Sequence, residues 1–362
     1  MEQTFPAESS TVQKTQSETY IQPVSSRRFD LLYSLLCIWF IFGMLIDSWA
    51  HTFNIANTRE TFFTPWHAVL YTGFGAIAAM LGWVVLRNFR AAPSWKESVP
   101  RGYELSLLGI GMFGIGGIVD PLWHLIVGRE VRLDILLSPT HLLLITAINL
   151  IISGPVRAEW RRDETSFSLQ SGLPVLISTL LLLYVLSFPF IYNHPIQVYS
   201  SPARISTSFY LFGDILGSSG IIMHTAVLMG LILIMLRRWR LPFGIFTFLL
   251  GGMYVMVAPQ HPTYGALLPL IIGMFLAGFL CDVLYRLVKP SYTELFKLRL
   301  FSFLMPVIVY SLYFASVGLF DGIGWTIHLV VGNIIISGLV GLAVALALTI
   351  AATPNLPTLQ KP

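Results

Sequence analysis

The sequence predicts an all-α integral membrane protein, a polytopic bundle of about ten transmembrane helices. Of its 362 residues, 55% are hydrophobic and 11% are charged, whereas roughly 25% of the residues in soluble domains are charged. The mean hydropathy is +0.73. Long apolar runs recur along the chain, each close to the roughly 20 residues that a helix needs to cross about 30 Å of hydrocarbon. These observations exclude a soluble globular enzyme.

The apolar runs define ten predicted spans, of which the seventh is shorter than the others. It is separated from the eighth at "PQHPTYG", where two prolines bracket His261 and favour a turn. In chain order the predicted spans cover residues 29–52, 62–86, 105–128, 136–156, 173–193, 208–236, 243–259, 264–288, 300–320 and 326–351.

The basic residues predict the orientation of the bundle. If the N-terminus is cytoplasmic, 18 of the 22 lysines and arginines fall in the cytoplasmic segments, as the positive-inside rule requires. The exceptions are Arg59, Arg129, Arg132 and Arg204. We therefore expect a multi-pass protein of the cell membrane with both termini cytoplasmic. The net charge of +4 follows from this topology and gives no indication of nucleic-acid binding. Membrane lipid is the expected partner, and other membrane subunits or a homo-oligomer remain open.

The predicted domain organisation is one transmembrane domain between two polar tails. Residues 1–28 are rich in Ser, Thr, Gln and Glu and predict a disordered cytoplasmic tail, residues 29–351 form the transmembrane helical domain, and residues 352–362 form a second cytoplasmic tail. Cys37 and Cys281 both fall toward the cytoplasmic ends of their spans. This placement predicts neither a disulfide framework nor a thiolate metal site.

A parallel internal repeat covers the first two helical hairpins, at about residues 29–86 and 105–156. The first span ends in "GMLIDSWAH" and the third in "GGIVDPLWH". Each has a glycine, an apolar pair directly before an aspartate, and a histidine four residues after that aspartate. A loop containing Arg-Glu follows in both copies, and the next span opens with Thr/Ser-Pro-x-His. Two spans separate the copies, so both copies have the same orientation in the membrane.

The spacing predicts that each copy gathers one aspartate and two histidines. Residues four apart share a helix face, Thr and Ser are natural N-caps, and proline suits the first helical position, so the second histidine falls in the first turn of its helix. A short hairpin then brings both helix ends to one depth. The two predicted triads are Asp47, His51 and His67, and Asp120, His124 and His141.

Each triad is a candidate site for a transition metal ion. Two histidines and one carboxylate form a recognised ligand set for iron and are chemically acceptable to copper or zinc. The simpler interpretation is that histidines anchor the helices at the membrane interface and that aspartates cap helix ends. Two matched triads at membrane depth, where ionisable groups are costly, favour metal binding.

The other histidines carry no predicted role. Seven of the eight map to the expected outer ends of spans or to outer loops, and His224 alone falls deeper. "FIYNH" and "SPAR", around His194 and Arg204, have the form of a decayed third copy. Asp321 and His328 share a helix face, which is compatible with accessory ligands or proton carriers, but helix capping by the aspartate with a solvated histidine is favoured. The roles of His194, His224, His261 and His328 therefore remain open.

Two other patterns predict structural contacts. The glycines of "GIGMFGIGG", Gly109 to Gly117, have small-x3-small spacing and are expected to draw the third span against the first. Asp282 precedes Arg286 by four residues and predicts a structural ion pair.

The run Asp47-x3-His51, followed by "RET" and by "TPWH" ending at His67, resembles the metal-site segment of the C subunit of the copper membrane monooxygenases, the particulate methane and ammonia monooxygenases. In that family the matching Asp, His and His bind copper within the membrane near its outer side. The resemblance implies that Asp47, His51 and His67 are copper ligands. It covers about residues 43–74 and is duplicated at about 116–148. The loop after His51 is a few residues longer than in the family, the chain has more spans than a C subunit, and no segment resembles a cupredoxin-like domain.

Four functions are consistent with this sequence. The first is a copper-dependent membrane oxidoreductase, or a subunit of one, with a second ion at Asp120, His124 and His141. The second is a protein that binds or transports a transition metal, although few polar residues mark a path through the bundle. The third is a zinc-dependent intramembrane hydrolase in which Glu60 or Glu130 activates metal-bound water. The fourth is a metal-free membrane scaffold.

The predicted topology can be tested by cysteine labelling in a background that lacks Cys37 and Cys281. Thiols introduced at Asn57 and Arg132 should react with an impermeant reagent added from outside the cell, because both residues fall in predicted outer loops. Labelling of these positions only from the cytoplasmic side would overturn the predicted orientation.

Overall fold

The computed structural model describes residues 22–53, 64–128, 136–163, 167–198, 207–261, 267–320 and 322–350. These residues are overwhelmingly helical, and the described ranges contain no strand beyond one isolated bridge between Ser291 and Glu294. Most of both predicted tails, residues 1–21 and 352–362, lies outside the described residues. The predicted fold class, an all-α polytopic membrane bundle, is confirmed.

Helices occupy all ten predicted spans. Within the described ranges, nine helical segments are long and apolar enough to cross a membrane, and the tenth, Ile245–Gln260, is shorter, as its sequence predicts. In chain order the helices are α1 (Arg27–Thr52), α2 (Pro65–Phe89), α3 (Glu104–Val127), α5 (Pro139–Ile152), α6 (Gly154–Trp160), α7 (Leu169–Ser187), η1 (Phe188–Asn193), α8 (Pro195–Val198), α9 (Thr207–Arg238), α10 (Ile245–Val257), η2 (Ala258–Gln260), α11 (Leu268–Val288), α12 (Leu295–Phe320) and α13 (Ile327–Leu348).

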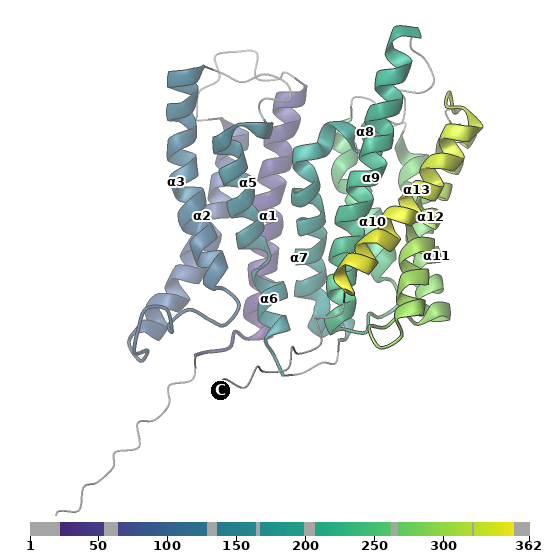
Figure 1. Ribbon diagram of the computed structural model, residues 1–362. Helices are drawn as coiled ribbons and strands as arrows, with labels where there is room; N and C mark the ends of the chain where they lie inside the picture. Colours follow the sequence, from purple (N-terminus) through teal and green to yellow (C-terminus); the bar gives the residue numbers. More distant parts are fainter. Residues whose placement is uncertain are drawn as a thin grey trace, which may run out of the picture.

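The bundle has two parts with α7 between them (Figure 1). On one side α1 pairs with α2 and α3 pairs with α5. On the other side α10 to α13 pack in sequence, and α9 packs against α13. Helix α7 contacts α1 and α5 on one side and α9 and α10 on the other. The span that contains α7 is 67% buried in its most apolar stretch, whereas that of α2 is only 17% buried. Helix α7 is therefore central, and α2 is peripheral with much of its apolar surface available to lipid.

The glycine-rich stretch of α3 packs differently from our prediction. A methyl group added at Gly109 would lie 2.8 Å from the Ala147 carbonyl oxygen of α5, and one at Gly117 would lie 3.1 Å from the Tyr71 hydroxyl of α2. The glycines thus allow close contact with α5 and α2, and the expected packing of their surface against α1 is wrong. Helix α1 instead meets α3 through ring contacts such as Phe40 with Phe113, whose centroids are 5.0 Å apart.

Asp282 forms a helix-capping contact instead of the predicted ion pair. Its carboxylate accepts hydrogen bonds from the backbone N–H groups of Phe246 and Thr247, at 3.2 and 3.0 Å, and from the Thr247 hydroxyl at 2.7 Å. It therefore satisfies the open N–H groups at the start of α10, where a carboxylate is favourable. The Arg286 guanidinium lies over the Phe243 ring at 6.0 Å, so the predicted pairing of Asp282 with Arg286 is wrong.

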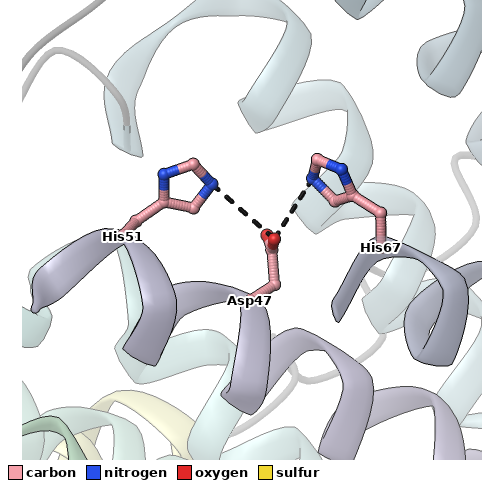
Figure 2. A group of neighbouring side chains, drawn as sticks. All are labelled: Asp47, His51 and His67. Atoms are coloured by element: carbon pink, nitrogen blue, oxygen red, sulfur yellow. Dashed lines mark ion pairs between the residues drawn. The ribbon is translucent and has the colours of Figure 1, made fainter. Parts of the chain in front are cut away.

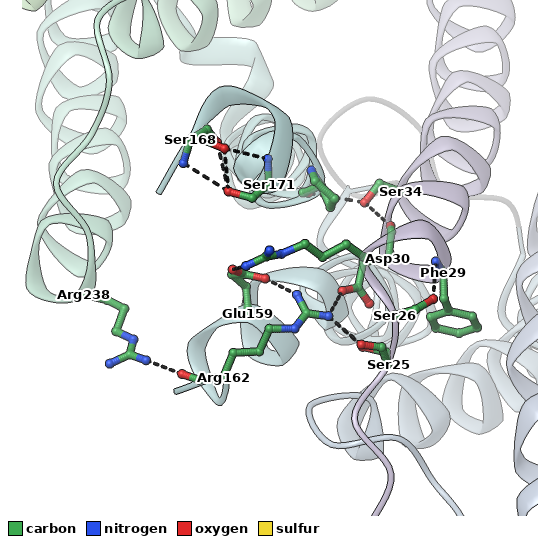
Figure 3. Close-up of polar contacts among 12 residues, drawn as sticks. Ser25, Ser26, Phe29, Asp30, Ser34, Glu159, Arg162, Ser168, Ser171 and Arg238 are labelled. Atoms are coloured by element: carbon green, nitrogen blue, oxygen red, sulfur yellow. Dashed lines mark hydrogen bonds and ion pairs between the residues drawn. The ribbon is translucent and has the colours of Figure 1, made fainter. Parts of the chain in front are cut away.

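A buried polar network ties the two parts together at the end of the bundle where α1 begins (Figure 3). Asp30, which is 1% exposed, accepts a hydrogen bond from the Tyr103 hydroxyl at 2.7 Å and pairs with Arg162. The Arg162 guanidinium also pairs with Glu159, and its backbone carbonyl accepts a hydrogen bond from Arg238 of α9. The network fixes α1, α3, α6 and α9 relative to one another.

Replacement of Asp30 by Asn should destabilise the protein by about 2 to 3 kcal/mol, because a buried ion pair loses its anion while the Arg162 cation stays in place. The exposed pair of Glu294 with Lys297 provides a matched control, and Glu294→Gln should cost less than about 1 kcal/mol. Unfolding of the detergent-solubilised variants, followed by circular dichroism, measures both. Equal stability of the two variants would show that the Asp30 network is energetically unimportant.

Candidate metal centre

The ends of two helical hairpins position the triad residues, and the predicted caps are confirmed. The Thr64 side chain accepts a hydrogen bond from the backbone N–H of His67 at 3.3 Å, with Pro65 at the first position of α2. Ser138 does the same for the N–H of His141 at 3.3 Å at the start of α5. Each cap therefore places a histidine in the first turn of its helix.

The first triad converges around the Asp47 carboxylate (Figure 2). The Oδ1 atom of Asp47 lies 3.6 Å from His51 Nε2 and 3.1 Å from His67 Nε2. Asp47 and His51 come from the last turns of α1, and His67 comes from the first turn of α2. The two imidazole rings flank the carboxylate from opposite sides, with their centroids 6.4 Å apart. All three side chains predicted to form this site therefore come together.

The second triad repeats this arrangement with one difference. Asp120 Oδ2 lies 3.4 Å from His124 Nε2, and Asp120 Oδ1 lies 3.7 Å from His141 Nδ1. The same His141 Nδ1 atom also lies 2.7 Å from the Ser138 hydroxyl oxygen, within hydrogen-bonding distance. A metal ion that bound His141 through Nδ1 would have to displace this contact, which predicts a weaker second site.

Glycines at matched positions let each hairpin close tightly enough for its triad to form. Gly43 precedes Asp47 by four residues, and a methyl group added there would lie 2.5 Å from the backbone of Leu70, three residues after His67. Gly116 precedes Asp120 by four residues, and a methyl group added there would lie 2.8 Å from the side chain of Leu144, three residues after His141. The first contact is with backbone and the second with a side chain. A larger residue at Gly43 would therefore force the two helices of the first hairpin apart.

The geometry of each triad fits a single metal ion. In each triad the carboxylate oxygen and one nitrogen of each histidine all lie within 4.8 Å of one another. A tetrahedral ion with bonds of about 2.1 Å holds its ligand atoms about 3.4 Å apart, close to the 3.1 to 3.7 Å between the carboxylates and the imidazoles. Direct charged hydrogen bonds would be shorter, about 2.7 to 2.9 Å. Three protein ligands would also leave one position open for a further ligand.

The electrostatics of the first site favour a positive charge beside Asp47, whose side chain is 21% exposed. Asp47 Oδ1 is buried, and no hydrogen-bond donor among the described residues serves it. A buried anion is costly unless a charge or hydrogen bonds compensate it, and a cation between the imidazoles supplies that charge. The N-terminus of α2 is the positive end of a helix and opposes a cation, so the carboxylate is what makes the site acceptable to one. Because the His51 side chain is 37% exposed, the site remains accessible.

A buried histidine pair in the other half of the molecule was not predicted from the sequence. His194, which follows η1, and His224 of α9 are both buried, and their ring centroids are 4.4 Å apart. His194 Nδ1 accepts a hydrogen bond from the N–H of Ile196 at 3.2 Å, which places the proton of the neutral ring on Nε2. The signal was weak because the two histidines are far apart in sequence, and the motif around His194, interpreted as a decayed third copy of the repeat, does not include His224.

The remaining polar residues noted in the sequence do not join either triad. His261 is buried beside η2, and His328 is exposed at the start of α13. Glu60, Glu130 and Asp321 lie outside the described residues, so the general-base role required by a zinc hydrolase stays a prediction. Cys37 and Cys281 are free and buried.

Comparison of the chain with models of known protein families finds no match, and none is found among curated proteins or solved structures.

Replacement of His51 or His67 by Ala should remove most of the bound metal, because a site that loses one of three protein ligands no longer outcompetes water. Replacement of His124 or His141 should remove less, since the Ser138 hydroxyl already competes for His141. Elemental analysis of the four purified variants beside the parent protein makes the measurement. Equal losses of metal from variants of both triads would indicate one shared dinuclear site. Unchanged metal content in all four variants would contradict metal binding and indicate that these histidines are interfacial anchors.

Proposed function

We propose that this protein holds a transition metal ion at Asp47, His51 and His67, and that it acts as a copper-dependent membrane oxidoreductase or as a subunit of one. The observation that carries the proposal is the convergence of one carboxylate and two imidazoles within 4.8 Å of one another at the end of a membrane hairpin. The resemblance of residues 43–74 to the C subunit of copper membrane monooxygenases supports copper and oxidative chemistry.

Ligand chemistry also favours copper. Nitrogen and oxygen ligands bind Cu²⁺ more tightly than the other divalent ions of the first transition series, including iron and zinc. His51 and His67 would hold the ion from the ends of two different helices, while Asp47 would balance its charge. A bound copper ion would supply one-electron redox chemistry, and the fourth position would admit a further ligand from the exposed side of His51.

The polar residues of the bundle support a site at one end over a transport path. Asp214, His224 and Asp282 are the residues that would have to mark such a path. Asp282 is engaged by the start of α10 through three hydrogen bonds, so it is not available to a moving ion. Delivery of metal to another protein stays compatible with a one-ended site, because an exposed histidine permits ligand exchange.

The proposal is tested on the detergent-purified protein by elemental analysis and by electron paramagnetic resonance. The parent protein should contain copper and give a Cu²⁺ signal that a mild reductant abolishes and reoxidation restores. The double variant His51→Ala, His67→Ala should lose most of that signal.

The matched control is His328→Ala, which removes an exposed histidine at the start of α13 and should leave the signal intact. Zinc in place of copper would favour the hydrolase alternative. A parent protein that contains no metal and takes up neither ion would favour the metal-free membrane scaffold.

A further inference from the structure

A buried glutamine from the second half of the molecule contacts α1 directly beside Asp47. Gln260 ends η2 and is 4% exposed. Its Oε1 atom accepts a hydrogen bond from the Ser48 hydroxyl at 2.9 Å, and its Nε2 donates to the Leu45 carbonyl oxygen at 3.3 Å. Ser48 follows Asp47 in the chain, and Leu45 precedes it by two residues. We call these two hydrogen bonds the Gln260 clamp.

The clamp acts on the part of α1 that carries two of the three proposed ligands. Asp47 and His51 project from the last turns of α1, so a rotation of these turns moves both side chains together. A side chain reaches about 5 to 6 Å from the helix axis, and a rotation of about 10° displaces its end by about 1 Å. Metal sites tolerate deviations of only about 0.2 Å in their bond lengths. The rotation of this helix end therefore decides whether Asp47 and His67 can share one ion.

In the part of the chain that the structure describes, the second triad has no equivalent of the clamp. When Asp47 is aligned with Asp120, Ser48 corresponds to Pro121 and Leu45 to Ile118. Proline has neither a side-chain hydroxyl nor a backbone N–H to donate. The two triads thus have the same ligand types but differ in how the rest of the molecule holds the helix that presents them.

We propose that Gln260, acting through Ser48 and Leu45, is a positioning residue of the first metal site, and that it raises the metal affinity of this site selectively. The inference rests on the proposed metal-binding function. Because equilibrium coupling is reciprocal, metal bound at Asp47 also stabilises the contact of η2 with α1. The first site is then linked to the second half of the molecule, and the second site is not.

The proposal is tested by titration with Cu²⁺ against a competing chelator, with the second triad disabled by His124→Ala and His141→Ala. In this background Ser48→Ala and Gln260→Ala should each weaken binding at the first triad about tenfold, near the lower end of the effect of residues that orient metal ligands. Their combination should weaken binding little further, because both remove the same contact. Ser48→Thr keeps the hydroxyl and should retain the parent affinity.

The matched control is another amide–hydroxyl pair far from the triads. Asn333 of α13 donates a hydrogen bond to the Ser218 hydroxyl of α9 at 3.0 Å, and Asn333→Ala and Ser218→Ala should leave copper affinity unchanged. The same clamp variants, studied with His51→Ala and His67→Ala instead, should not alter binding at the second triad.

Unchanged affinity in Ser48→Ala, or an equal loss at both triads, would overturn the positioning role while leaving the metal site intact. Absence of metal binding in the parent protein would overturn the proposed function and this inference together. Ser48→Ala removes one hydroxyl oxygen and creates little space, so it answers the question even if Gln260→Ala fails to fold.

Discussion

A carboxylate held between two imidazoles at the end of a membrane hairpin is the constraint that the first half of this molecule is built around. Asp47 Oδ1 is buried, and no donor in the described ranges satisfies it, so its charge needs a cation nearby. A protonated His67, whose Nε2 lies 3.1 Å away, could supply that charge, whereas the 3.6 Å from His51 Nε2 is too long for a hydrogen bond. A metal ion between the three side chains, as proposed, would satisfy the carboxylate and both imidazoles at once. The helix caps, the tight hairpins and the repeat all serve to bring these groups together.

Glycines at the points where α1 and α2 cross allow the two helix backbones to approach closely. Gly43 admits the backbone of Leu70, and Gly73, at the next crossing point, admits that of Phe40. With α1 and α2 this close, one turn of helix beyond Gly43 brings Asp47 level with His67. Packing between small residues is the main means by which membrane helices associate closely. The same residues that stabilise the hairpin therefore also set the geometry of its site.

Local signals predicted the fold and both triads, whereas contacts between distant segments could not be predicted. Span length, the Thr64 and Ser138 caps and the spacing of Asp47 with His51 depend on neighbouring residues, and the structure confirms them. The partner of Asp282 depended on where α10 would begin, 36 residues earlier in the chain. The pairing of His194 with His224 depended on how η1 packs against α9. In both cases tertiary packing, which a helical repeat does not encode, decided the outcome.

The two triads have the same residue types but different surroundings. Both copies present an aspartate and two histidines, but Ser138 competes for His141 in the second, and Gln260 restrains the helix turn of Asp47 in the first. If both triads bind metal as proposed, each difference would act in the same direction, toward tighter binding at the first triad. The restraint comes from η2, which follows α10, and the polar network of Asp30 and Arg162 fixes the opposite end of α1. Helix α1 is thus held at both ends by contacts outside its own hairpin, so the affinity proposed for its site would depend on the packing of the whole bundle.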